Sequence, residues 1–249
     1  MTTWILLRGL TREAGHWGSF PGDLRDALGK ATVVAIDLPG AGTLHDLRSP
    51  ANIEDIARHC RAQAQALDLQ PPYHLIALSL GAMVAVAWAT KHPEELTAAV
   101  LINTSLGSHC PPWCRLKPRN YPALLRLLLP ATDATRESII YRLTSNRPGN
   151  EAATVRAWAA LRQKHPVAAA NAFRQLWAAA RYRPPAIDRP RLLVLASRGD
   201  RLVDPGCSRR LAQAWHTDYA EHPDAGHDLP LDDGPWVAAR IAEWLQGVA

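Results

Sequence analysis

Residues 75–85, LIALSLGAMVA, place one serine between two apolar runs. The residues before Ser79 are typical of a buried strand, and the small apolar residues after it favour a helix. A serine at such a joint could simply cap the helix. It could also be a nucleophile on a sharp strand-to-helix turn, for which Ala77 and Gly81 are small enough. The rest of the chain bears on which interpretation applies.

The composition indicates a folded protein with a substantial core. The chain has 249 residues, of which 47% are hydrophobic, enough for one large domain or a core with an insertion. No apolar run has the length of a membrane span. The N-terminal apolar run meets Arg8 at once, which favours a first strand over a signal peptide. The cysteines are few and scattered (Cys60, Cys110, Cys114 and Cys207), so we expect free thiols and a cytoplasmic location.

Short apolar runs alternate with helical patterns along most of the chain. The first five predicted strands are almost continuously apolar, as in a parallel sheet covered on both faces. The alternation predicts an α/β fold with a mostly parallel sheet of about six strands flanked by helices. Strands are expected at 4–9, 31–37, 73–78, 99–103, 191–197 and 217–222, and helices at 19–29, 52–68, 80–91, 204–215 and 234–246.

One section breaks this alternation. It follows the fourth predicted strand and predicts only helices, at 121–129, 133–145, 150–164 and 167–181, separated by Pro130, Pro148 and Pro166. We therefore expect a core made of residues 1–104 and 189–249, with a helical cap at 105–188. Sites in open α/β sheets lie beyond the carboxyl ends of the strands, so an insertion leaving such an end would cover the site.

Two further residues follow predicted strands and could act with Ser79. Asp200 comes just after the fifth strand, and His227 lies in a loop after the sixth. The chain order serine, aspartate, histidine suits a nucleophile, an orienting carboxylate and a general base on this type of sheet. Asp204 is the alternative acid, and His222 is the nearest alternative histidine.

Asn103, which ends the fourth strand, carries an amide and cannot replace the carboxylate.

Three stretches together resemble a known family. The segment LLRGLTREAGHW (6–17) resembles its His-Gly strand end, IDLPGAG (36–42) its Asp-x-Pro-Gly-x-Gly loop, and LSLGAMVAVAWATKHPEEL (78–96) its nucleophile turn and helix. The chain therefore resembles serine hydrolases of the α/β-hydrolase fold with a helical cap, similar to carboxylesterases and thioesterases of the methyl-ester carboxylesterase branch. The resemblance covers nearly the whole length.

The resemblance implies a carboxylic ester or thioester hydrolase that needs no cofactor and no metal. Ser79 would be the nucleophile, His227 the base and Asp200 the carboxylate that orients the base. The backbone N–H groups of Leu10 and Leu80 would form the oxyanion hole. A member of the same fold that binds a small ligand without catalysis is the alternative.

The chain departs from the family at its first strand. Arg8 stands where relatives carry histidine before the oxyanion-hole glycine, here Gly9. Both residues are candidates for substrate binding, although Arg8 could instead form a structural pair with Glu13 or another loop carboxylate. Because the chain starts directly at the strand carrying Arg8, we also expect the family's usual first two strands to be absent, which leaves about six.

Other site types are less well supported. A pI near 9.3 permits nucleic-acid binding, but no recognition motif accompanies it. Cys110 and Cys114 with His109 lack the spacing and the second pair of a zinc site. Gly40 and Gly42 lack the lysine of a phosphate loop.

The positive charge is concentrated in the predicted cap. Residues 105–188 hold thirteen Lys or Arg and four Asp or Glu, a net +9, which leaves −4 for the remainder. A basic lid would attract an acidic substrate carrier, such as an acyl-carrier protein or coenzyme A. A solvated lid whose arginines pair with the core is the alternative.

Overall fold

The computed structural model describes residues 2–29, 31–147, 151–187 and 190–247. Six parallel strands form one sheet in the order β2-β1-β3-β4-β5-β6, which confirms the predicted fold class. The strands are β1 (Thr2–Leu7), β2 (Ala31–Ile36), β3 (Tyr73–Leu78), β4 (Leu96–Ile102), β5 (Arg191–Ser197) and β6 (Asp218–His222).

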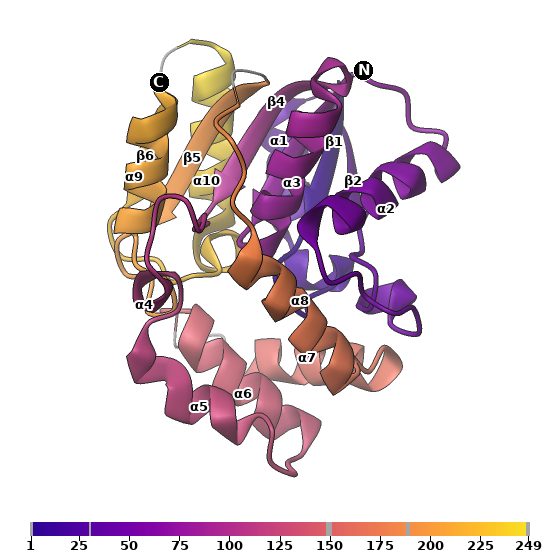
Figure 1. Cartoon of the computed structure of the whole chain (residues 1–249), viewed down its shortest axis with the longest axis vertical. Coiled ribbons are helices and arrows are strands. Elements are labelled where there is room, and N and C mark those ends of the chain that lie inside the picture. The colour runs from indigo at the N-terminus through magenta and orange to yellow at the C-terminus, as the bar shows by residue number, and fades with distance from the viewer. Residues whose placement is uncertain (1, 30, 148–150, 188–189, 248–249) are drawn as a thin grey trace.

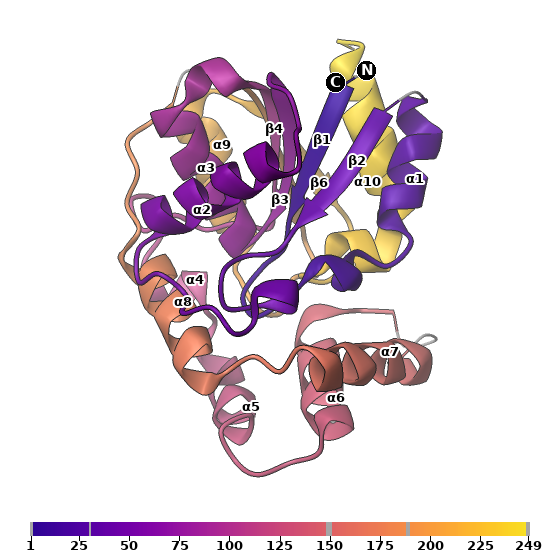
Figure 2. The ribbon, with the colours of Figure 1, turned by 90° about the vertical axis from the view of Figure 1, so that its right-hand side faces the viewer.

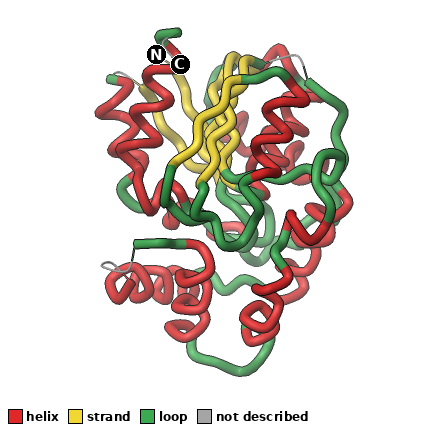
Figure 3. The backbone as a smooth tube through the Cα atoms, turned by 90° about the vertical axis from the view of Figure 1, so that its left-hand side faces the viewer, coloured by secondary structure: helices red, strands yellow, loops and turns green. Residues whose placement is uncertain are grey.

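Helices cover both faces of the sheet (Figures 1 and 3). One face packs against α1 (Phe20–Leu28) and α10 (Leu229–Leu245), and the other against α2 (Ile53–Ala66), α3 (Leu80–Lys91) and α9 (Gly206–Trp215). Single 3₁₀ turns are η1 (Ala14–Trp17), η2 (Gly42–Leu44), η3 (Pro93–Glu95) and η4 (Pro118–Asn120). No helix in the described ranges combines the length and apolar character needed to cross a bilayer.

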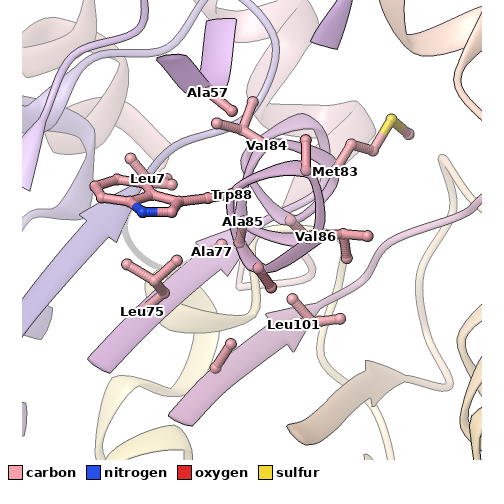
Figure 4. Packing of buried hydrophobic residues seen from close by; sticks show 14 of the residues in the cluster. Leu7, Ala57, Leu75, Ala77, Met83, Val84, Ala85, Val86, Trp88 and Leu101 are labelled. Carbon is pink, nitrogen blue, oxygen red and sulfur yellow. The ribbon is translucent and has the colours of Figure 1, made fainter. Parts of the chain in front are cut away.

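Helix α3 forms the centre of the core because it is apolar on every side. All of its residues from Leu80 to Ala89 are buried. Figure 4 shows Val84, Ala85 and Trp88 of this helix among buried side chains that include Leu75 of β3 and Leu101 of β4. Each fully buried large aliphatic side chain contributes about 1.5–3 kcal/mol of transfer free energy. The helix that follows Ser79 is therefore firmly fixed to the sheet.

The last helix begins earlier than its predicted start at residue 234. The segment α10 already starts at Leu229, but Asp233 has non-helical backbone angles of φ −153° and ψ 73°. The Asp233 side chain accepts a hydrogen bond from the Trp236 N–H at 3.1 Å and so caps the second part. The extra turn at 229–232 directly follows His227 and Asp228.

In the part of the chain between β4 and β5 that the structure describes there are five α-helices. They are α4 (Pro112–Arg115), α5 (Tyr121–Arg126), α6 (Asp133–Thr144), α7 (Glu151–Lys164) and α8 (Ala169–Arg181). The sequence predicted the last four but not the single turn of α4, which follows Pro111. Three sequence predictions lie outside the described residues: the helix start at 150, the separating Pro148 and the domain boundary at 188–189. We call residues 105–187 the helical insertion, and Figure 2 shows it on the side toward which β1 and β2 point.

Buried polar contacts fix the insertion to the loop that follows β1. Glu137 of α6 accepts a hydrogen bond from Arg12 at 2.6 Å, and Gln175 of α8 accepts one from the Thr11 N–H at 2.9 Å. His165 lies 2.9 Å from Glu13. Buried polar groups that lose their partners carry a large desolvation cost, so these contacts define where the insertion sits.

The close approach of α3 to β1 depends on Gly81. A Cβ there would collide with the Leu7 carbonyl oxygen and lie 2.7 Å from the Arg8 carbonyl oxygen. Because both neighbours are backbone atoms, Gly81→Ala should lower the free energy of unfolding by about 2–3 kcal/mol. Urea denaturation measures this change.

Gly22→Ala is the matched control, because Gly22 is helical and has nothing within 4 Å of its would-be Cβ. It should be neutral or slightly stabilising. Equal losses from both substitutions would contradict the packing argument.

Candidate active site

Ser79 lies on a strained turn between β3 and α3. Its backbone angles are φ 56° and ψ −111°, a conformation that costs about 1–3 kcal/mol for a residue other than glycine. The Ser79 N–H donates to the Ile102 carbonyl at 2.9 Å, and Thr104 Oγ1 donates to the Ser79 carbonyl at 3.1 Å. The Ser79 side chain makes no capping hydrogen bond to α3. The helix-cap interpretation is therefore not what the structure shows.

Asp200 and His227 form a buried pair. Asp200 Oδ2 lies 2.7 Å from His227 Nδ1, and the two residues are 2% and 5% exposed. The other oxygen, Asp200 Oδ1, accepts the Leu202 and Val203 N–H groups at 2.8 and 2.9 Å. Because an ionised carboxylate only accepts, His227 Nδ1 carries the proton of this bond. In the neutral ring Nε2 is then left with a lone pair.

The rejected alternatives have other partners. Asp204 Oδ1 accepts the Gly206 N–H at 2.7 Å, at the start of α9. His222 ends β6, where its Nδ1 accepts the Ala225 N–H at 2.9 Å and its Nε2 lies 3.2 Å from Asp233. The structure thus brings Asp200 rather than Asp204 to His227.

Asn103 holds the loops together, a role that the sequence did not suggest. Its side-chain oxygen accepts the Ser197 N–H at 2.8 Å, and its nitrogen donates to the His227 carbonyl at 2.8 Å. The backbone of Asn103 is also left-handed, with φ 46°. The one feature of the sequence that could have indicated this role is that a polar asparagine follows a buried apolar strand. The amide joins the ends of β4 and β5 to the loop carrying His227.

All of the candidate residues except Asp200 line one cavity of about 450 Å³. Ser79, His227, Arg8, Gly9, Leu10 and Leu80 all contribute to its wall. The helical insertion supplies mostly aliphatic lining, including Leu116, Leu124, Leu127, Leu143 and Leu176. This volume is in the range of small-molecule sites, and the lining favours an apolar group.

Two backbone donors at the cavity wall have no hydrogen-bond partner among the described residues. Over the described ranges, the N–H groups of Leu10 and Leu80 donate to no other group. Gly9 lies against the serine, since a Cβ on it would be 3.4 Å from Ser79 Cβ. Free N–H groups beside a serine are suited to binding a negatively charged oxygen.

Arg8 pairs with Asp228 and not with Glu13. Its Nη1 and Nη2 atoms lie 3.0 and 2.5 Å from the two Asp228 oxygens, and the guanidinium lies 4.8 Å from the Trp17 ring centre. Arg8 is 2% exposed. Although it contributes to the cavity wall, its charge is neutralised by the residue next to His227. The sequence hinted at this ion pair only in that Asp228, a carboxylate, directly follows the candidate base His227.

The structure does not support the metal and phosphate alternatives. Within the described residues, the one group with metal-ligand geometry is His92, Glu94 and Glu95, away from the cavity, and Glu95 is bonded to Arg61. All four cysteines are free thiols. The glycine-containing loop after β2 is closed by Asp37, which accepts the Thr43 N–H at 2.9 Å, as expected of a turn.

Comparison with known proteins agrees with this architecture. Residues 4–240 match the model of the alpha/beta hydrolase family. The biotin biosynthesis bifunctional protein BioHC of Teredinibacter turnerae is 32% identical over 102 residues, which are 41% of this chain and only 17% of that relative.

Two solved structures share the fold over almost the whole chain. A thermophilic esterase from Thermogutta terrifontis has a TM-score of 0.76 at 20% identity and covers 100% of this chain and 90% of its own. An enol-lactonase from Burkholderia xenovorans has a TM-score of 0.74 at 19% identity and covers 98% and 91%. Because the family model spans nearly all of the sequence and the strand order and turn geometry agree with it, the chain belongs to the alpha/beta hydrolase family.

Proposed function

We propose that the protein is a serine hydrolase that cleaves a carboxylic ester or thioester through an acyl-enzyme. The observation that carries the proposal is the buried 2.7 Å contact between Asp200 and His227 at a cavity that also contains Ser79. A strained serine, an oriented imidazole and free backbone donors are the parts that acyl transfer requires.

In the proposed reaction, Ser79 Oγ attacks the acyl carbon while His227 Nε2 accepts the hydroxyl proton. The Leu10 and Leu80 N–H groups bind the oxyanion of the tetrahedral intermediate. His227 then returns the proton to the leaving alcohol or thiol, and the acyl-enzyme remains. A water molecule, deprotonated by His227, releases the acid and regenerates Ser79. Asp200 stabilises the imidazolium in both halves.

The helical insertion would act as the cap that forms the acyl pocket. We divide the chain into a core at 1–104 and 189–249 and a cap at 105–188. The aliphatic lining contributed by α5, α6 and α8 supports this division and favours an apolar acyl group. The similar structures include an esterase and an enol-lactonase, and both names indicate cleavage of an ester bond. The free thiols fit a cytoplasmic location.

Arg8 would support the site and not bind substrate. Its ion pair joins the loop after β1, which carries Leu10, to the residue after His227. Removing one member of such a buried pair leaves an uncompensated charge.

An acidic acyl carrier is the second candidate substrate form. Several insertion arginines donate to backbone carbonyls, among them Arg115, Arg136 and Arg174. A carbonyl fixes the guanidinium but leaves its charge in place. Arg142 and Arg162 are paired with carboxylates of the insertion itself. The insertion's positive charge therefore remains unneutralised by the core for the most part, which favours a phosphate-bearing or acidic partner.

The nucleophile is tested with Ser79→Ala. Hydrolysis of p-nitrophenyl butyrate should fall about a thousandfold or more while the thermal unfolding midpoint stays near that of the wild type. A fluorophosphonate should label Ser79 in the wild-type protein, as mapped by peptide mass spectrometry.

The acid is tested with Asp200→Asn, which should also lower the hydrolysis rate severely. Asp204→Asn is its matched control and should retain most activity. Absence of both labelling and turnover would instead indicate a ligand-binding protein.

The role of Arg8 is tested with Arg8→Gln. The unfolding free energy should fall by about 3–5 kcal/mol, because Asp228 is left buried without a counter-ion. Arg58→Gln is the matched control: Arg58 lies equally close to Asp55, at 2.5 Å, but on the surface. It should cost less than about 1 kcal/mol. A rise in KM confined to carboxylate-bearing esters, with unchanged stability, would show that Arg8 recognises substrate.

The carrier hypothesis is tested by salt dependence. With a coenzyme A thioester, kcat/KM should fall steeply as salt screens the insertion, while an uncharged thioester with the same acyl group should change little. The neutral substrate controls for salt effects on the enzyme. An equal response of both substrates, or no preference for the charged form at low salt, would exclude steering by the insertion.

A further inference from the structure

Two cysteines lie together behind the wall of the active-site cavity. Cys110 precedes α4 in the helical insertion, and Cys207 is the second residue of α9. They share a small buried cluster with Val203, and Leu202 packs against it. Leu202 and Val203 also line the cavity. We call Cys110 and Cys207 the thiol pair.

A cation is bonded to this pair. Arg210, one turn after Cys207 on α9, donates to Cys110 Sγ at 2.9 Å and lies 3.9 Å from Cys207 Sγ. Arg210 itself is exposed, so the buried pair lies directly beneath a surface side chain. A guanidinium at this distance stabilises a thiolate and increases its reactivity. Cys60 is as buried as Cys207, at 0% exposure, but belongs to the main core cluster.

The two thiols differ in protonation. A hydrogen bond from Cys207 and the Arg210 guanidinium lower the pKa of Cys110 to about 6, against the opposing effects of burial and of Asp204. The bond to Cys110, together with burial, raises the pKa of Cys207. Arg115 also faces the pair. Because Arg210 lies closer to Cys110 than to Cys207, Cys110 is the thiol of the pair that loses its proton more readily.

We propose that Cys110 and Cys207 are a modification site, a thiol pair that hydrogen peroxide oxidises to a disulfide. The Cys110 thiolate attacks one peroxide oxygen, the O–O bond breaks, and hydroxide leaves and takes up a proton as water. Cys110 is then a sulfenic acid, oxidised by two electrons. The Cys207 sulfur attacks the Cys110 sulfur, the S–O bond breaks, and the leaving hydroxide takes the thiol proton as a second water.

The disulfide would join two segments that already contact one another near the acid. The Asp204 N–H donates to the Cys114 carbonyl at 2.9 Å, and the Lys117 N–H donates to the Leu202 carbonyl at 3.0 Å. Cys110 belongs to the first segment and Cys207 to the second. Oxidation would therefore make the contact between the insertion and the loop after Asp200 covalent.

The test treats the full-length wild-type protein with hydrogen peroxide and maps its peptides without reduction. The expected product links the Cys110 and Cys207 peptides, and dithiothreitol removes the link. Cys207→Ser should instead accumulate a sulfenic acid on Cys110 that dimedone traps. Oxidation of Cys110 without any link to Cys207 in the wild type would overturn the proposal.

A second measurement follows alkylation of Cys110 by iodoacetamide across pH. In Arg210→Gln the pH midpoint should rise by about one unit, because the thiolate loses its cation. Arg209→Gln is the matched control: it is the adjacent exposed arginine and pairs with Glu221. An unchanged midpoint in Arg210→Gln would contradict the assignment. Neither readout uses ester hydrolysis, so failure here is distinguishable from failure of the proposed function.

Discussion

The contact between the start of α3 and the end of β1 underlies the whole site. Gly81 brings the helix against the Leu7 and Arg8 carbonyl oxygens, where no side chain fits. This approach places the loop carrying Gly9 and Leu10 beside Ser79. The strained backbone of Ser79 is tolerated because a helix buried on every side and a central strand hold its two ends. Core packing, rather than any bond made by the serine side chain, maintains the turn.

Around this turn, buried polar side chains hold the remaining loops. Asn103 connects β4 and β5 to the loop with His227, and Arg8 connects the loop after β1 to Asp228. Asp200 uses one oxygen for its own loop and the other for the imidazole. Because each of these groups is costly to bury without its partner, they define a single loop arrangement.

The alternation of strands and helices could be predicted well because it depends on residues that are close together in the sequence. Six strands, the helices between them and the helical insertion were predicted from periodicity and proline positions, and the structure has them. The meeting of Asp200 with His227 followed from their places after neighbouring strands. Contacts between distant residues were not readable in this way. The Arg8–Asp228 pair spans 220 positions, and the closeness of Cys110 to Cys207 depends on how the insertion folds back. The helical turn at 229–232 was missed because the Asp-Asp-Gly-Pro stretch at 232–235 is typical of a turn, and the break at Asp233 separates it from the predicted helix.

The attachment of the insertion has a consequence for how this protein can diversify. Gln175 and Glu137 bond to Thr11 and Arg12, the two residues that follow Leu10. The helices that shape the pocket thus also support the backbone next to the proposed oxyanion donor. An insertion transplanted from a relative would change the pocket and at the same time remove these supports. The same insertion therefore determines both the shape of the pocket and the position of this loop. New substrate specificities are more readily reached by point substitutions on the aliphatic faces of α5 and α6 than by exchange of the whole insertion.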